Sequence, residues 1–151
     1  MGVGDHNHSK GIQFYNLGLD DRNYIEPHYK WSMKSLDSIY QSIHPPDTKP
    51  IIDYLKIDIE FAEWRVLPQL IKTGMLKRIR QLHVEIHLSK GDSLDLLRQR
   101  VGVLKAVEDA GMIRFDSRGN PYHRAVINSL DDPADLSLGY DLAWYQILPP
   151  S

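Results

Sequence analysis

The chain has 151 residues, of which 42% are hydrophobic and 25% are charged, as in an ordinary globular domain. A chain of this length can bury about 70% of its unfolded surface, which is enough for one real core. Its net charge of −2 offers no electrostatic attraction to nucleic acid or to an anionic membrane, so we expect neither as a partner. Cysteine is absent, which excludes disulfides, thiolate nucleophiles and cysteine-based metal sites.

The sequence carries no targeting signal that we can identify. No apolar stretch reaches the ~20 residues that a membrane helix needs, and the polar start differs from a secretory signal peptide. The compartment is therefore left open. We expect residues 1–10, which are polar and small, to form a flexible lead-in, and residues 11–151 to form the folded part.

The first half of the chain predicts two strands with a helix between them. Residues 12–17 are a short β-type run closed by Gly18, and residues 20–30 have no period and are expected to be loop. Apolar residues at helical spacing predict a helix from Ser35 to the Pro45–Pro46 pair. Residues 51–59 are rich in β-branched side chains, which is typical of a central buried strand.

The second half continues the alternation. A helix is predicted from about Trp64 to Gly74, with a kink or a late start at Pro68. Residues 79–88 predict a strand, and Ser93 caps a helix that runs to Ala110. The expected inner face of that helix is Leu97, Val101, Leu104 and Val107. Short strands are then predicted at 112–115, 125–127 and 136–148.

This order of elements indicates the fold class. Strands that alternate with helices favour an α/β fold with a mostly parallel sheet, because parallel strands need a crossover connection. The last strands follow one another without a helix between them, so we expect them to form a C-terminal antiparallel hairpin. The sequence therefore predicts a mixed α/β domain in which ligands bind at the carboxyl ends of the strands.

Polar side chains gather where the two central strands end. Side chains alternate between the faces of a strand, so Asp58 and Glu60 share one face of the first strand. Glu85 and His87 share one face of the second. If the strands are parallel neighbours, all four side chains meet at one rim. Two carboxylates and an imidazole there would hold a divalent cation or supply a general base.

A purely structural interpretation also fits this pattern. A polar strand face is often just the solvated side of an edge strand, and Lys56 with Asp58 or Glu60 would make a simple ion pair. A metal-dependent hydrolase that uses the same rim is a further alternative. No glycine-rich phosphate or nucleotide loop precedes these strands, so the sequence gives no complete cofactor site.

The sequence resembles the FkbM-type methyltransferases, and in particular their animal methyltransferase-like branch. The resemblance rests on residues 52–64, which include Lys56-Ile57-Asp58-Ile59-Glu60, and on residues 81–87, which end in Glu85-Ile86-His87. Residues 14–19 and 36–39 also correspond to segments of that family. The similarity spans about residues 10 to 148.

The resemblance implies a Rossmann-like sheet with helices on both faces and a reaction that transfers a methyl group from S-adenosylmethionine to a hydroxyl oxygen. The acceptor would be a small molecule or a glycan. It implies catalytic roles for Asp58, Glu60 and His87, and cofactor contacts for Gly18, Leu19 and Asp58. Catechol-type relatives further imply a divalent cation such as Mg²⁺ bound by Asp58, Glu85 and His87.

Two departures limit the resemblance. The family's glycine-rich first loop has no counterpart here, and Phe61 stands where the bacterial pattern favours glycine. We therefore expect residues 11–151 to be the C-terminal part of a methyltransferase domain, with an incomplete sheet and weak cofactor binding on its own. The alternative is a degenerate, non-catalytic interaction domain. An exposed sheet edge would then invite self-association.

Overall fold

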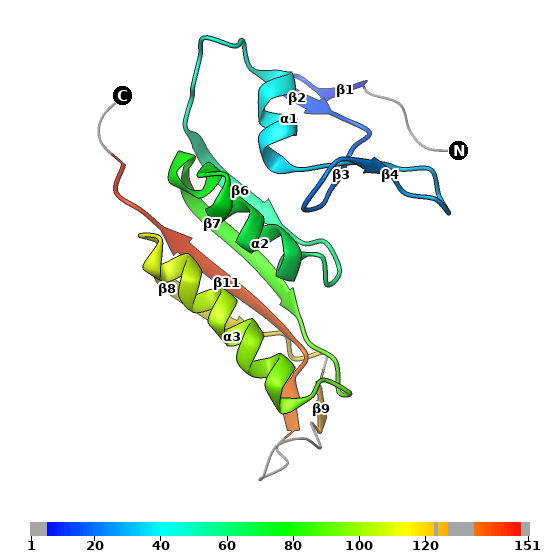
Figure 1. The fold of residues 1–151 in the computed structure, drawn as a ribbon, viewed down its shortest axis with the longest axis vertical. Coiled ribbons are helices and arrows are strands. Elements are labelled where there is room, and N and C mark those ends of the chain that lie inside the picture. The colour runs from blue at the N-terminus through cyan, green and yellow to red at the C-terminus, as the bar shows by residue number, and fades with distance from the viewer. Residues whose placement is uncertain (1–5, 123, 127–134, 149–151) are drawn as a thin grey trace.

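The structure is a computed structural model that describes residues 6–122, 124–126 and 135–148. Residues 1–5 of the expected lead-in and residue 127 of an expected strand lie outside the described residues. The described part is an α/β fold with three α-helices and mixed sheets (Figure 1). Its main sheet has the strand order β6 (Ile52–Ile57), β7 (Ile79–His87), β11 (Gly139–Tyr145) and β8 (Ile113–Gly119).

β6 and β7 are parallel neighbours, as the sequence predicted. β6 is, however, an edge strand of the described sheet and Tyr54 on it is 55% exposed, so the expectation of a central strand buried on both faces is wrong. β6 pairs with β7 from Ile52 opposite Ile79 to Ile57 opposite Val84. The crossover between them is α2 (Glu63–Lys72) followed by the 3₁₀ turn η1 (Met75–Arg78). Both strands therefore start at one edge of the sheet and end at the other.

The rest of the main sheet is mixed, so a mostly parallel Rossmann-like sheet is not confirmed. β11 lies between β7 and β8 and is antiparallel to both. The physical reason is the connection. No helix lies between β8 and β11 in the described residues, and strands joined without a crossover helix return in the opposite direction.

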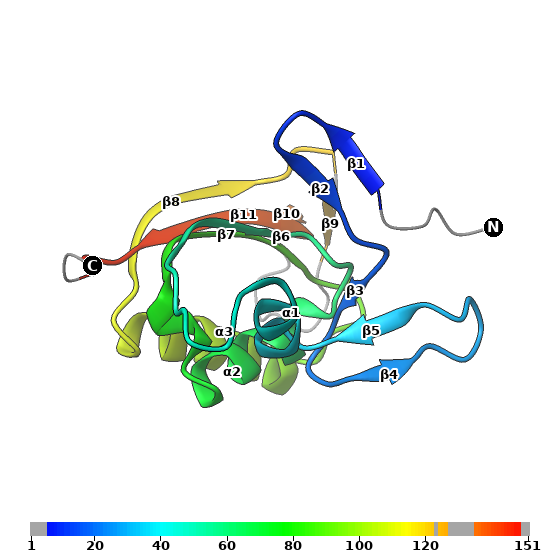
Figure 2. The ribbon, with the colours of Figure 1, turned by 90° about the horizontal axis from the view of Figure 1, so that it is seen from above.

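The helices cover one face of the main sheet rather than two. Figure 2 shows α1 (Leu36–Ile43), α2 and α3 (Leu94–Asp109) on the same side. Side chains on that face of β7 and β11, such as Leu82, Val84 and Trp144, are fully buried. The expectation of helices on both faces is therefore wrong for the described residues. The opposite face presents Tyr54 and Phe115 to solvent. No helix in the described part is long and apolar enough to cross a membrane.

Helix α3 is capped as predicted, and its predicted inner face is confirmed at Leu104 and Val107 but not at Val101. The Ser93 hydroxyl oxygen accepts the backbone N–H of Leu96 at 3.2 Å. Val107 is fully buried, whereas Val101 is 63% exposed and does not belong to the inner stripe. Helix α2 runs without interruption through Pro68, which offers no N–H for the carbonyl of the preceding turn.

The N-terminal part forms small sheets beside the main one. β1 (His6–Ser9), within the expected lead-in, pairs with β2 (Ile12–Phe14), and Gly11 turns between them with φ of +81°. A three-stranded sheet combines β3 (Gly18–Leu19), β5 (Ser32–Lys34) and β4 (Tyr24–Ile25), the last inside the segment expected to be loop.

Near the C-terminus, a short antiparallel pair joins β9 (Arg124–Val126) and β10 (Asp135–Ser137).

A buried carboxylate connects this N-terminal part to α2. Asp20 is 2% exposed and accepts hydrogen bonds from Arg65 Nη2 at 2.9 and 3.0 Å and from the Tyr24 hydroxyl at 2.7 Å. Burial raises the pKa of Asp20, but the bonds from Arg65, Tyr24 and the backbone of Asp21 together bring it below its usual value. The ionised form is therefore the one that the fold stabilises.

This carboxylate predicts an acid-sensitive contribution to stability. Because the pKa of Asp20 is lower in the folded state than its usual value of 3.8, its contribution is complete above that value and is lost as the pH falls through the folded pKa. We expect Asp20→Asn to lower the free energy of unfolding by about 1–2 kcal/mol at pH 7 and by less at pH 3. Urea unfolding at both pH values measures this. An equal loss at the two pH values would contradict the assignment.

Candidate functional site

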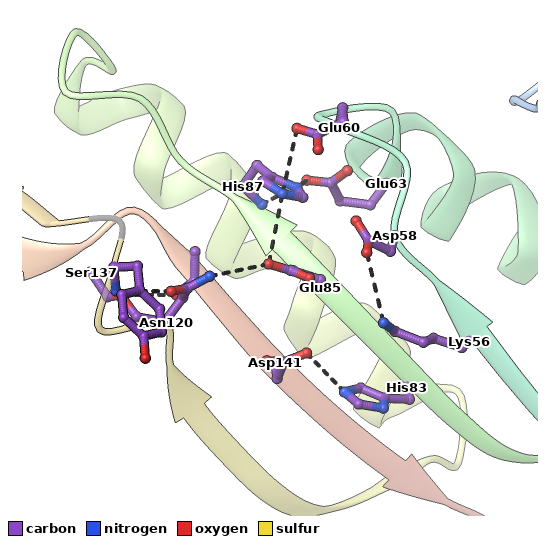
Figure 3. A network of polar contacts seen from close by, with 12 residues as sticks. Lys56, Asp58, Glu60, Glu63, His83, Glu85, His87, Asn120, Ser137 and Asp141 are labelled. Carbon is purple, nitrogen blue, oxygen red and sulfur yellow. Dashed lines mark hydrogen bonds and ion pairs between the residues drawn. The ribbon is translucent and has the colours of Figure 1, made fainter.

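The predicted rim exists at the carboxyl ends of β6 and β7. Figure 3 shows Asp58, Glu60, Glu63, Glu85 and His87 gathered there. Asp58 directly follows β6, whereas Glu85 and His87 are among the last three residues of β7. We call these five residues the carboxyl-end cluster. It contains every residue that the sequence placed at the rim.

A left-handed turn directs Glu60 towards His87. Glu60 and Phe61 have φ of +48° and +70°, a region that side chains other than glycine rarely adopt. This conformation costs about 1 kcal/mol or more for each residue, and it gives a physical reason for the glycine that the bacterial pattern favours at position 61. The turn brings Glu60 Oε2 to 3.6 Å from His87 Nε2. The Phe61 ring lies 5.5 Å from the imidazole ring, measured between centroids.

His87 is held in place by the first two residues of α2. Glu63 Oε1 accepts the backbone N–H of His87 at 2.7 Å and lies 3.2 Å from Nδ1 of the same residue. The Trp64 indole N–H donates to the backbone carbonyl of His87 at 2.8 Å. Both backbone groups and the ring of His87 are therefore fixed by side chains of one helix.

The buried Glu63 carboxylate determines how the imidazole is oriented. Glu63 has no exposed surface and His87 is 6% exposed. An ionised carboxylate beside Nδ1 favours the tautomer in which Nδ1 carries the proton and donates it. Nε2 then keeps its lone pair on the side of Glu60 and Glu85. Such a nitrogen can accept a proton or bind a cation.

A possible cation site differs from the predicted one by a single residue. Asp58, Glu60 and His87 each offer a ligand atom, and these atoms lie within 4.8 Å of one another. The sequence predicted Glu85 in place of Glu60. Glu85 Oε1 lies 4.0 Å from His87 Nε2 and accepts a long hydrogen bond of 3.5 Å from Asn120. Asp58 lies 3.7 Å from Lys56 Nζ, which is the simple ion pair considered from the sequence.

Gly18 and Leu19, the cofactor contacts implied by the resemblance, lie in β3. That strand pairs with β5 and does not belong to the main sheet. A Cβ atom at Gly18 would come within 2.4 Å of the sulfur of Met33, so close packing already accounts for glycine here. Their role in cofactor binding stays a prediction.

Glu63 is the residue whose role the sequence did not reveal. It stands in the segment that carries the resemblance, but its position before an apolar helix is also typical of an ordinary acidic residue at a helix start. Only the packing of α2 against the end of β7 identifies it.

Two curated proteins match part of this chain. "Probable methyltransferase-like protein 24" from Homo sapiens is 39% identical over 72 residues, which cover 44% of this chain and 20% of that protein. The protein of the same name from Rattus norvegicus is 41% identical over 63 residues, covering 38% and 17%. The matches thus span a fifth or less of these relatives. No family model matches, and no solved structure matches.

These matches support a relationship to a methyltransferase family and nothing finer. They do not confirm the FkbM type. They also leave open the acceptor and whether these residues belong to a longer protein.

The geometry predicts very different roles for the two glutamates beside His87. Glu63→Ala removes the acceptor of a buried backbone N–H, so we expect a loss of about 2–3 kcal/mol in the free energy of unfolding. Glu60 has a side chain that is 79% exposed, so Glu60→Ala should change it by about 0.5 kcal/mol or less. Chemical denaturation of both variants measures the difference. Similar losses would contradict the proposed hold on His87.

Proposed function

We propose that this chain belongs to an S-adenosylmethionine-dependent O-methyltransferase of the FkbM type, and that its carboxyl-end cluster handles the hydroxyl acceptor. The acceptor would be a small molecule or a sugar. The observation that carries the proposal is His87, whose ring is oriented by a buried carboxylate while Nε2 faces further carboxylates. The partial matches to proteins named methyltransferase-like support the reaction class.

The cluster supplies what a hydroxyl acceptor needs. An alcohol attacks efficiently only as it loses its proton, and His87 Nε2 is placed to take that proton. Glu63 stabilises the imidazolium that results, because its carboxylate lies 3.2 Å from Nδ1. Asp58 or Glu60 would orient the acceptor by hydrogen bonds. S-adenosylmethionine, when bound, supplies an electrophilic methyl group on a sulfonium.

The residues present fit the acceptor side better than the cofactor side. The sequence has no glycine-rich strand–loop–helix, and Gly18 has a packing explanation. Among the proposed cofactor contacts, Asp58 alone is part of the cluster. We therefore propose that strong binding of S-adenosylmethionine needs a unit outside these 151 residues.

The cluster also fits a divalent cation. Carboxylate oxygens suit Mg²⁺, and an imidazole extends the choice to Mn²⁺. Asp58, Glu60 and His87 would hold the ion, and Glu85 is close enough to His87 to join them. A cation there would stabilise the negative charge that develops on the acceptor oxygen.

Mn²⁺ provides a test that does not require turnover. We expect Mn²⁺ to broaden the NMR signals of His87 and its neighbours. Asp58→Asn and His87→Gln should each weaken Mn²⁺ binding by about tenfold or more. Asp53→Asn is the matched control, because Asp53 lies on the same strand and its 76% exposed side chain pairs with Arg80. Equal weakening in the control would remove the cluster as a metal site.

Methyl transfer is tested separately with methyl-labelled S-adenosylmethionine. The acceptors are catechol and methyl glucoside, which represent a vicinal diol on a planar ring and a sugar. The assay is run on a protein in which these residues are joined to a glycine-rich cofactor unit. The proposal is supported if the label is transferred to an acceptor and if His87→Gln reduces that transfer. Full transfer by both Asp58→Asn and His87→Gln would remove these residues from the mechanism. Metal-stimulated phosphatase turnover without the methyl donor would favour a hydrolase instead.

A non-catalytic interaction domain is the second candidate, and the uncovered face of the main sheet favours it. Tyr54, Phe115 and Tyr145 on that face are 55%, 60% and 37% exposed, and β6 is an edge strand of the described sheet. Exposed aromatic side chains and an unpaired strand edge invite association. For this candidate we expect a mass above that of a monomer in light scattering, reduced by Phe115→Ser. A monomer at all concentrations would argue against self-association.

A further inference from the structure

Two basic residues lie where β6 and β7 begin. Lys49 precedes β6 and Arg78 directly precedes β7, and the parallel pairing brings the two starts together. Arg78 Nη1 donates to the backbone carbonyl of Lys49 at 3.3 Å. Because β7 has nine residues that each rise ~3.3 Å, this end lies roughly 25–30 Å from the carboxyl-end cluster.

A cavity of about 670 Å³ opens between these residues, the end of α1 and the end of α2. Its size lies within the range of small-molecule sites. The residues that line it include Tyr40, His44, Pro46, Lys49, Met75 and Arg78. We call this the amino-end cavity.

The amino-end cavity has an excess of positive charge. Lys49 and Arg78 form no ion pair with a carboxylate among the described residues. The acidic residue that also lines the cavity is Asp37, whose Oδ1 already accepts the side-chain amide of Gln69 at 2.7 Å. An anion in the cavity would therefore meet cations that have no other charged partner there.

The apolar walls are fixed in position. The Tyr40 hydroxyl donates to the carbonyl of Pro50 at 2.6 Å, and its ring lies 4.6 Å from that of His44. The guanidinium of Arg78 lies over the Tyr40 ring, 5.8 Å from its centroid. Met75 is 5% exposed and belongs to the core. Rigid aromatic and apolar walls next to cations lower the cost of ordering a ligand.

We infer that the amino-end cavity binds a small organic monophosphate. Arg78 and Lys49 pair with the phosphate, since a guanidinium fork and an ammonium are the usual partners of that group. The organic part lies against Tyr40, Pro46 and Met75. This site is independent of the carboxyl-end cluster and does not rest on the function proposed for it.

A structural explanation competes with this inference. Helices α1 and α2 both end at the cavity, and the carbonyl ends of helices attract cations without any ligand. The carbonyls of Tyr40 and Gln69 near these ends accept backbone N–H groups of His44 and Thr73. If Lys49 and Arg78 only stabilise the helix ends, no ligand should bind in the cavity. The two explanations therefore differ in a measurable way.

The test uses phenyl phosphate as the probe, with inorganic phosphate and phenol as its two halves. Isothermal titration of the full chain should give tighter binding for phenyl phosphate than for either half. NMR shift changes should map to His44, Thr73 and Arg78. We expect Arg78→Gln and Lys49→Gln each to weaken binding about tenfold, because each removes a charge-assisted contact. Arg98→Gln, an exposed cation on α3, is the matched control and should bind like the parent.

Several results would overturn the inference. The first is that the folded chain does not bind phenyl phosphate at 10 mM. The second is that Arg78→Gln and Lys49→Gln both bind it as tightly as the parent. An equal loss in Arg98→Gln would do the same, since it would indicate non-specific charge attraction. Circular dichroism confirms that each variant is folded. Two separate variants keep the test decisive if one of them does not fold.

Discussion

The hydrogen bonds between Glu63 and His87 are the interaction on which the carboxyl-end cluster depends. Burying a carboxylate is costly unless it is well paired. Glu63 meets that requirement with one oxygen, which takes both the backbone N–H and the ring of His87, and with its place in the first turn of α2, where the helix dipole favours negative charge. Its other oxygen is buried without a hydrogen-bond partner among the described residues. A displacement from His87 would therefore leave the whole carboxylate buried and unpaired, which is why the two residues hold each other in place.

The first turn of α2 joins three parts of the molecule through three consecutive residues. Glu63 binds the end of β7, and Arg65 binds Asp20 in the N-terminal part. Trp64 donates to His87 and carries the guanidinium of Arg100, 5.1 Å from its ring centroid, which links it to α3. A shift of α2 would disturb all three contacts at once. The position of His87 is therefore set by the packing of the whole domain rather than by the local turn.

The sequence was informative where a local pattern determines the structure. The run of β-branched residues in β6, the cap at Ser93 and the polar ends of β6 and β7 all have short-range causes, and all were predicted. It failed where the outcome depends on distant partners. Periodicity does not state on which face of a sheet a helix packs, nor that β11 inserts between β7 and β8. For the same reason it could not predict the left-handed turn that brings Glu60 to His87, because that turn has no sequence signal other than Phe61.

One pair of parallel strands accounts for the opposite charge at the two ends of the sheet. Parallel pairing aligns both starts and both ends, so the residues before β6 and β7 lie together at one end of the sheet and the residues after them lie together at the other. The first end collects Lys49 and Arg78, and the second collects Asp58 and His87. Antiparallel pairing would have mixed a start with an end and separated each set. Since the two sets of residues share no side chain, a substitution at one end of the sheet leaves the side chains at the other end in place. The β6–β7 pair with its crossover helix therefore positions both proposed sites.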